Sequence, residues 1–500
     1  MASHPEIEAY KLMSAGRFAE ALPLAQRAVV GQRVCLPTHG MLATILLRLG
    51  RRDDAESVIS EALALQQGPA DAYDALAHVC ALLGQHERSH SLYRRTVTLA
   101  PDDPRFWHNL ASSERSLGRL REAEEACDRT IALDRARYAT FLLRSELRVQ
   151  TGDANHVAEL QIELSRNGPD DRARMFLGYA LAKELDDLKR YDEAFQCLAA
   201  ASAIRRRHLA YDVAVDQRKL KRIEEVFAES TIAVSTRAPT GNSSGASICE
   251  SSADASSSRH VFIVGLPRSG TTLLEHMLIG LSNVRSNGET DHFGQALLSA
   301  APRDRGDVFA GAAAADPAVV AARYEQLAGG GSKHDRVIEK LPMNYLYLGA
   351  IYRALPGAKL VLVNRHPVDS CFAMYRILFG EAYPFSYDFD DLAKYYAAYE
   401  RLMDHWRASL GDALYEVTYE DLVKEPARVG AGVAGYCGLQ WNDQAVEVHK
   451  RSTVSLTASA AQIRRPIYGS SSGRWRHYER HLQPLIEALR REQVSLPSDV

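Results

Sequence analysis

Residues 260–278 read HVFIVGLPRSGTTLLEHML, and this stretch decides the fold of the second half of the chain. A short apolar run that ends at Gly265 predicts a buried strand, and apolar residues at helical spacing from Thr271 predict a helix. The intervening loop, Gly265–Thr272, is of the kind that directs backbone N–H groups and a helix N-terminus at an anion. Loops that bind nucleoside triphosphates with magnesium carry Lys at the position of Thr271, whereas here the cation is Arg268, inside the loop. The sequence therefore predicts a nucleotide-phosphate site, but not one for ATP with magnesium.

Length and composition limit the classes of protein to which the chain can belong. Its 500 residues exceed what one core supports, and 46% hydrophobic with 25% charged residues is ordinary for a globular protein. The formal net charge of −3 argues against a nucleic-acid partner. Scattered cysteines without a Cys-x-x-Cys pair predict free thiols and no structural zinc. No signal peptide and no membrane-spanning run is visible, so we expect a cytoplasmic protein without a membrane partner.

The N-terminal third of the chain repeats with a period of 34 residues. Glycine occupies one fixed place in each period, at Gly16, Gly50, Gly84, Gly118 and Gly152, with mostly Ala or Ser seven residues before and five residues after it. Two antiparallel helices cross closely where both present small side chains, and the turn between them needs a residue that tolerates positive φ. This pattern is the tetratricopeptide signature. We expect an all-α solenoid over residues 1–235, with a looser sixth unit around Ala182 and Ala194 and a groove for a peptide or protein partner.

Composition changes abruptly after the repeats. Ser fills eight of the nineteen positions from Thr240 to Ser258, which predicts a flexible linker over residues 236–259. Strand and helix signals then alternate over residues 260–500. Strands are expected at Val261–Val264, Arg336–Glu339, Lys359–Asn364 and Leu414–Thr418, and a helix from about Pro367 to Leu378. This alternation predicts a parallel sheet covered by helices, with ligands at the carboxyl ends of the strands. The expected fold class is thus α followed by α/β.

The phosphate loop also carries a family resemblance. Its Pro-Arg-Ser-Gly-Thr-Thr spelling resembles the 5′-phosphosulfate loop of sulfotransferases that use 3′-phosphoadenosine-5′-phosphosulfate (PAPS), and looks most like bacterial proteins with tetratricopeptide repeats ahead of a sulfotransferase domain. The resemblance covers about residues 260–490 and implies a P-loop-type domain, PAPS as co-substrate and no metal. It implies that the 5′-phosphate lies on Pro267, Arg268, Ser269, Gly270, Thr271 and Thr272.

Two further residues are implied to be catalytic. Glu289, 21 residues after Arg268, matches the catalytic base of protein-tyrosine sulfotransferases, which would take the proton of the acceptor hydroxyl. His292 stays open as the alternative base. Lys340, at the end of a predicted strand, matches a lysine that approaches the oxygen between sulfate and phosphate. With Arg268 it would stabilise the negative charge that grows on the leaving phosphate.

The run Arg365-His-Pro-Val-Asp369 resembles the 3′-phosphate motif of these enzymes, in which the arginine forms a charge-assisted fork with the phosphate. The motif places a serine eight residues after the arginine, but that position is Ala373 here, so the 3′-phosphate contact departs from the pattern. Ser370 lies on the same predicted helix and would point differently. We expect Asp369 to cap or brace the start of the helix.

Two more segments resemble nucleotide-binding parts of these proteins. Tyr419 matches a strand-end tyrosine that lies near the adenosine. The run Gln462–Tyr478 looks like the loop that folds over the nucleotide, in which Arg474 would reach the 3′-phosphate and Trp475 would anchor the loop. Read without the resemblance, the same run predicts a helix start capped by Ser472, with Trp475 and Tyr478 buried.

The expected function is transfer of a sulfuryl group from PAPS to an acceptor hydroxyl or phenol, on a peptide tyrosine or a saccharide, with release of 3′-phosphoadenosine-5′-phosphate (PAP). Two alternatives stay open. A P-loop nucleotide kinase or NTPase would need a lysine in place of Thr271. A catalytically inactive scaffold, whose repeats bind a partner, is favoured only by Ala373.

Overall fold

The computed structural model describes residues 4–31, 36–64, 68–228, 259–302, 306–329, 336–451, 464–467 and 469–497. The chain divides into two compact units: Met1–Leu188 with Ser452–Ala461, and Lys189–Arg451 with Gln462–Val500. Among the described residues, no helix is both long enough and apolar enough to cross a membrane.

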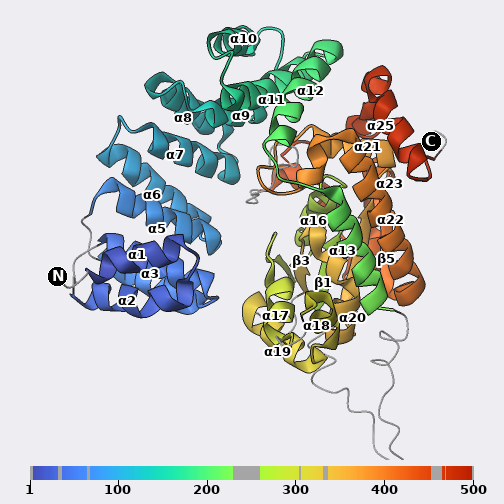
Figure 1. Ribbon diagram of the computed structural model, residues 1–500, viewed down its shortest axis with the longest axis horizontal. Helices are drawn as coiled ribbons and strands as arrows, with labels where there is room; N and C mark the ends of the chain where they lie inside the picture. Colours follow the sequence, from blue (N-terminus) through green and yellow to red (C-terminus); the bar gives the residue numbers. More distant parts are fainter. Residues whose placement is uncertain are drawn as a thin grey trace, which may run out of the picture. The chain divides into compact units, whose positions relative to one another are not determined.

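The first unit is a succession of helices (Figure 1). They are α1 (Pro5–Ser14), α2 (Phe18–Gly31), α3 (Leu36–Arg48), α4 (Arg52–Ala64), α5 (Ala70–Leu82), α6 (His86–Leu99), α7 (Pro104–Leu117), α8 (Leu120–Leu133), α9 (Tyr138–Glu146), α10 (Val157–Arg166) and α11 (Asp171–Asp187). Paired helices pack on each other and on the next pair, as α5 does with α6 and α6 with α7. This arrangement confirms the expected helical repeat region.

The small residues of the repeat are buried where helices cross, which confirms the reason given for the pattern. Ala9, Ala21, Ala43, Ala55, Ala77, Ala111 and Ala123 are all 0% exposed. Four of the repeat glycines adopt left-handed backbone, with φ between +73° and +82°. Gly152 does not, because the fifth turn is closed by a bridge between Thr151 and Ala154. The expectation of positive φ was therefore wrong at that one position.

The second unit contains a parallel sheet of five strands in the order β2-β3-β1-β4-β5. The strands are β1 (His260–Val264), β2 (Val284–Ser286), β3 (Arg336–Glu339), β4 (Lys359–Asn364) and β5 (Leu414–Thr418). Four of them confirm the predicted strands, while β2 was missed because three residues carry too little periodicity to read. Helix α21 (Pro367–Tyr375) is shorter than expected. The predicted parallel α/β domain is confirmed.

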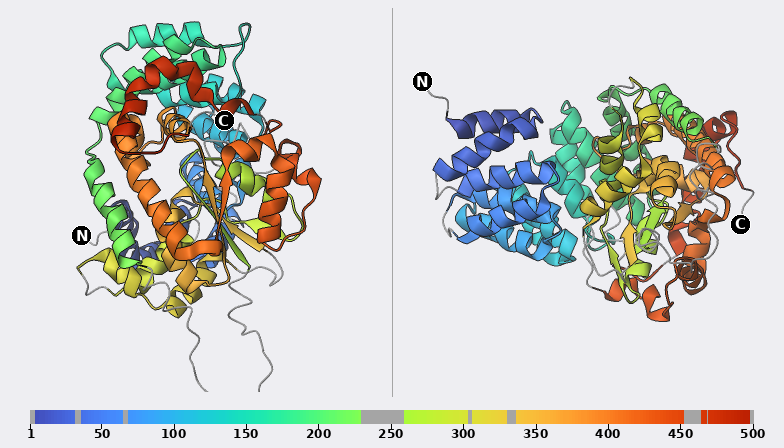
Figure 2. Two further views of the ribbon diagram at one scale, coloured as in Figure 1. Left: turned by 90° about the vertical axis from the view of Figure 1, so that its right-hand side faces the viewer. Right: turned by 90° about the horizontal axis from the view of Figure 1, so that it is seen from below.

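Helices cover both faces of the sheet (Figure 2). They include α16 (Thr271–Ile279), α17 (His292–Ala300), α18 (Val308–Ala314), α19 (Pro317–Ala328), α20 (Leu348–Ala354), α22 (Phe389–Leu410), α23 (Tyr419–Lys424), α24 (Pro426–Tyr436) and α25 (Glu479–Arg491). Strand β1 shows how the faces are divided. Val261 and Ile263 pack in one core with residues of α16 and α24. Phe262 points the other way, with ring contacts to Phe293 of α17 and Tyr324 of α19.

Helices α12 (Tyr191–Arg207) and α13 (Val213–Val226) belong to the same compact unit as the sheet. Tyr191 stacks on His477, and the Ser202 hydroxyl donates to the backbone oxygen of Tyr387. After α13, Phe227 packs edge-on against Trp406 of α22. The boundary between the compact units falls after Leu188, and the predicted extent of the repeats, residues 1–235, stays a prediction. Of the predicted linker, 236–259, only Arg259 lies within the described residues, so the linker stays a prediction.

An ion-paired cluster at the start of β1 predicts a pH-dependent stability. His260 Nε2 lies 2.7 Å from Glu325 Oε1, and Arg259 donates to the other carboxylate oxygen. Burial acts to raise the pKa of Glu325, but its bonds to His260 and Arg259 outweigh burial and lower the pKa from 4.5 to about 2. A carboxyl group whose pKa is lower in the folded than in the unfolded protein stabilises the fold at pH values above its unfolded-state pKa. This stabilisation is lost as the pH falls from about 4.5 toward 2.

We therefore expect Glu325→Gln to lower the free energy of unfolding by on the order of 2 kcal/mol at pH 7. The difference from wild type should shrink steadily below pH 4.5, because the wild-type carboxylate loses its charge. Urea unfolding followed by tryptophan fluorescence measures this, and Glu425→Gln, in an exposed pair with Arg428, is the control with no measurable change. A difference that is constant with pH would contradict the ion-pair account.

Candidate functional site

The loop between β1 and α16 has the backbone of an anion cradle. Arg268 and Gly270 adopt positive φ, of +69° and +105°, so successive N–H groups can converge on one point at the N-terminus of α16. The Ser269 hydroxyl is buried, and its oxygen has no hydrogen-bond partner among the described residues. A buried hydroxyl without a partner is unfavourable by about 1–3 kcal/mol, and an anion oxygen in the loop would remove that cost. Thr271 and Thr272 are buried beside it.

Gly270 is required where the loop meets the edge of the sheet. A Cβ atom on Gly270 would lie 2.5 Å from Cδ2 of Tyr419, the first residue after β5. Gly265 is under a similar constraint, because its φ is +150° and a Cβ atom would collide with the Val363 carbonyl. The carboxyl ends of β1, β4 and β5 therefore meet at this loop.

Lys340 and Glu289 form an ion pair at the end of β3. Lys340 is only 1% exposed, and its Nζ donates to Glu289 Oε1 at 2.5 Å. A second carboxylate, Glu275 of α16, lies 3.4 Å from the same Nζ. Glu289 is 38% exposed, so it is the member of the group that faces solvent. The structure therefore brings together two of the three residues that the resemblance implied to be catalytic, while Arg268, the third, lies in the loop before α16.

A different buried carboxylate, Glu339, holds the loop that carries Glu289. Its oxygens accept from Asn287 Nδ2 at 2.5 Å and from the Thr290 hydroxyl at 2.8 Å. His292 is buried in the same group, with Nδ1 3.1 Å from Thr290 Oγ1 and 3.7 Å from Glu339. His292 thus contacts polar groups of the protein, whereas the Glu289 side chain reaches solvent.

Arg365 lies where the resemblance places a 3′-phosphate. Its guanidinium stacks on the Tyr419 ring, 4.6 Å from the ring centroid. Nη1 donates to the Arg268 carbonyl at 3.0 Å, and Nη2 to the Ser471 carbonyl at 2.5 Å. Arg365 thus joins the phosphate loop to the C-terminal segment through two carbonyls, and its Nη2 also lies 3.8 Å from the carboxylate of Asp369.

The C-terminal segment is held against α21. The Asp369 carboxylate accepts from the backbone N–H of Gly473 at 2.5 Å and of Trp475 at 3.2 Å. Asp369 therefore caps η8 (Arg474–Tyr478) and not, as expected, its own helix. The Trp475 ring stacks on His366, with centroids 5.6 Å apart, and Tyr478 is buried. Arg474 is the first residue of η8 and follows Ser471, whose carbonyl accepts from Arg365, by three residues.

Glu275 and Glu339 were not among the residues singled out from the sequence. Both carried a readable signal: Glu275 interrupts the apolar stripe of α16, and Glu339 ends an otherwise buried strand. A charged side chain is rarely buried unless it is paired, so each indicated a buried partner.

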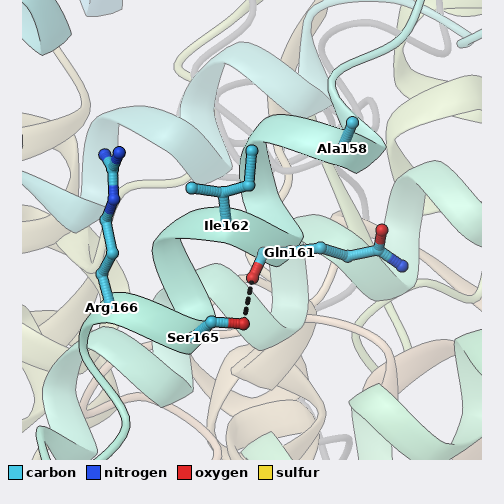
Figure 3. Close-up of a pocket in the computed structure, with 5 residues that line it drawn as sticks. All are labelled: Ala158, Gln161, Ile162, Ser165 and Arg166. Carbon is cyan, nitrogen blue, oxygen red and sulfur yellow. Dashed lines mark hydrogen bonds between the residues drawn. The ribbon is translucent and has the colours of Figure 1, made fainter.

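A shallow depression on the first unit is lined by α10 alone, as Figure 3 shows. Its residues are Ala158, Gln161, Ile162, Ser165 and Arg166, and the Ser165 hydroxyl donates to the Gln161 carbonyl. A single charged side chain and no converging polar groups give this surface no evident chemistry.

Comparison with known proteins agrees with this geometry. Residues 260–443 match the sulfotransferase family, and residues 70–113 and 104–137 match tetratricopeptide repeats. An uncharacterised protein of Aquifex aeolicus (strain VF5) is 28% identical over 388 residues, 75% of this chain; the chain spans about half of that protein, 48% of its length. A Caenorhabditis briggsae protein named "Putative protein-tyrosine sulfotransferase" is 25% identical over 233 residues, 43% of this chain and 80% of that protein.

Two solved structures are similar to separate parts of the chain. The sulfotransferase domain from the curacin biosynthetic pathway is 18% identical with a TM-score of 0.34, covering 47% of this chain and 98% of that domain. YrrB, a tetratricopeptide protein with an unusual peptide-binding site, is 15% identical with a TM-score of 0.27, covering 39% of this chain and 91% of YrrB.

The contact between Gly270 and Tyr419 yields a prediction about stability. Alanine in the left-handed backbone region lowers the free energy of unfolding by roughly 1–2 kcal/mol relative to glycine. A methyl group forced into a filled space lowers it by about a further 1–3 kcal/mol. Gly380 is the matched control, because its φ is +67° but nothing lies within 4 Å of a Cβ atom. We expect Gly270→Ala to lower Tm more than Gly380→Ala in thermal unfolding. In a Tyr419→Ala background, Gly270→Ala should lower Tm no more than Gly380→Ala does, and an undiminished cost there would contradict the steric account.

Proposed function

The chain carries a sulfotransferase-family domain behind tetratricopeptide repeats, and we propose from this that it transfers a sulfuryl group from PAPS to an acceptor hydroxyl or phenol. The observation that carries the proposal is the phosphate loop, where left-handed backbone and a buried Ser269 hydroxyl without a described partner precede α16. The phosphate group of a nucleotide supplies the acceptor oxygens that such a loop lacks.

Glu289 and Lys340 support the transfer step. In this step the acceptor oxygen forms a bond to sulfur, and the bond between sulfur and the bridging oxygen of the donor breaks. The acceptor proton passes to Glu289, and the electron pair of the broken bond stays on the 5′-phosphate of PAP. The Lys340 ammonium stabilises that added charge most strongly as it develops, which lowers the barrier. Arg268, in the loop, can assist.

We assign the base to Glu289 over His292. Glu289 is 38% exposed and touches Lys340, so an acceptor hydroxyl that approaches from solvent can reach it. His292 is buried and bonded to Thr290. A base must come within hydrogen-bond reach of the proton that it removes.

Arg365, Arg474, Tyr419 and Trp475 would hold the adenosine and its 3′-phosphate. Arg365 bonds to two backbone carbonyls and lies 3.8 Å from the Asp369 carboxylate. A phosphate is a stronger partner for a guanidinium than the two neutral carbonyls. Arg365 already forms a fixed fork against the Tyr419 ring, so this contact does not depend on the serine that Ala373 replaces. We further propose that the repeat groove presents a peptide or protein, because stacked repeats of this kind offer a concave surface.

The donor site predicts a specific thermal shift. A ligand that binds only the folded state, at 100 times its dissociation constant, adds about 2.7 kcal/mol to the free energy of unfolding. We expect PAP to raise the Tm of the full chain, with ADP giving a smaller shift and ATP with magnesium none. A shift with ATP and magnesium alone would favour the alternative of a P-loop nucleotide kinase or NTPase. No shift with any of the three would favour the inactive scaffold.

The assignment of the base predicts a loss of turnover without a loss of binding. Glu289→Gln keeps an oxygen that accepts from Lys340, so we expect the thermal shift with PAP to remain. Conversion of PAPS to PAP, with an acceptor found by screening phenols, tyrosyl peptides and saccharides, should fall by about 10²–10⁴-fold. His292→Gln is the control and should retain most of the turnover. The opposite pattern would transfer the role of base to His292.

A further inference from the structure

Lys340 is held by two carboxylates, from two elements that differ in exposure. Glu289 belongs to the loop after β2 and is 38% exposed, whereas Glu275 is buried in α16, the helix that begins at the phosphate loop. The Lys340 ammonium lies 2.5 Å from Glu289 Oε1 and 3.4 Å from Glu275 Oε2.

Glu275 is fixed by a closed ring of hydrogen bonds around Lys340. Its other oxygen, Oε1, accepts from the Ser286 hydroxyl at 2.5 Å. The Ser286 hydroxyl oxygen in turn accepts from the Gly288 N–H at 2.9 Å, and the Gly288 carbonyl accepts from the Lys340 N–H at 3.3 Å. The ring therefore ties α16, the loop that carries Glu289, and the end of β3 to one carboxylate.

On the basis of the proposed function, we propose that Glu275 is a positioning residue for sulfuryl transfer. It holds the Lys340 ammonium directed at the leaving 5′-phosphate when Glu289 releases it to take the acceptor proton. Without Glu275, no carboxylate of this group would hold the 1% exposed ammonium at that moment, and only the phosphate would balance its charge.

Two titratable groups of α16, Glu275 and His276, lie close to Lys340. Burial raises the pKa of Glu275, and the neighbouring Lys340 charge and the Ser286 hydroxyl act against that rise. His276, next to Glu275 on α16, has its pKa lowered to about 4 by burial and by the charges of Lys340, Arg451 and Arg464. His276 is therefore neutral near pH 7 and adds no second positive charge beside Lys340.

The Glu275 carboxylate could also change phosphate affinity in the opposite direction, and this difference allows a test of the proposal. A carboxylate near the phosphate repels it directly, so its removal would strengthen phosphate binding if Lys340 stayed in place unaided. If Glu275 acts through Lys340, its removal weakens phosphate binding instead. The sign of the change in affinity separates the two.

The experiment compares two nucleotides on the full chain by isothermal titration calorimetry. PAP carries the 5′-phosphate, and adenosine 3′-phosphate lacks it, so the ratio of their affinities isolates the contacts to the 5′-phosphate, that of Lys340 among them. We expect Glu275→Gln, which keeps an acceptor for Ser286, to weaken PAP about tenfold and to leave adenosine 3′-phosphate unchanged. A role in folding alone would change both affinities together. Glu325→Gln, which removes another partly buried, ion-paired carboxylate, should leave the ratio unchanged.

A double-mutant cycle tests whether the effect passes through Lys340. In a Lys340→Met background, Glu275→Gln should cause no further loss of PAP affinity. Unchanged or stronger binding of PAP by Glu275→Gln alone would overturn the positioning role, as would an equal loss in both backgrounds. If wild type itself fails to bind PAP, the donor site falls with everything that rests on it, and that result is distinct from a normal wild type with an unaffected Glu275 variant.

Discussion

The buried ammonium of Lys340 is the constraint on which the candidate site depends. A charge that is 1% exposed must be balanced by nearby anions, and here Glu289 and Glu275 do so from different elements. That requirement fixes the end of β3 against α16 and against the loop after β2. It also leaves a carboxylate and a cation in direct contact, and the proposed transfer uses these two groups for proton removal and phosphate departure.

The parallel sheet brings these groups together. Its strands end at one edge, where the phosphate loop follows β1, Lys340 follows β3, Arg365 follows β4 and Tyr419 follows β5. Contacts across that edge are tight, since Gly270 meets the Tyr419 ring and Arg365 bonds to the Arg268 carbonyl. The anion site is thus a property of the edge and of the loops that the strand order places side by side.

The sequence allowed prediction where a local signal was strong. The 34-residue period, the phosphate loop and four of the strands were readable because each rests on side chains close together in the chain. What escaped depends on distant partners: β2 is stabilised by pairing with β3, and the role of Asp369 depends on Gly473, 104 residues away. Glu275 could be recognised in the sequence as a charge on the apolar face of a helix, but its partner Lys340, at the end of β3, could not be predicted.

Helix α12 shows the same limit in a different way. Its alanines continue the repeat pattern, so sequence alone extends the array through it. Contacts far along the chain, from Tyr191 to His477 and from Ser202 to Tyr387, place it in the compact unit of the sheet. The repeat pattern predicts how a helix packs on its neighbour in sequence, but it does not predict which distant residues the helix contacts.

The central claim is that the carboxyl edge of this sheet binds the nucleotide of PAPS with its 5′-phosphate between the loop and Lys340. The most direct test is a crystal structure of the full chain with PAP. The account predicts 5′-phosphate oxygens within hydrogen-bond distance of Ser269 Oγ and Lys340 Nζ, with the 3′-phosphate on Arg365. A nucleotide bound with its 5′-phosphate away from Ser269, and Lys340 still paired only with carboxylates, would contradict it.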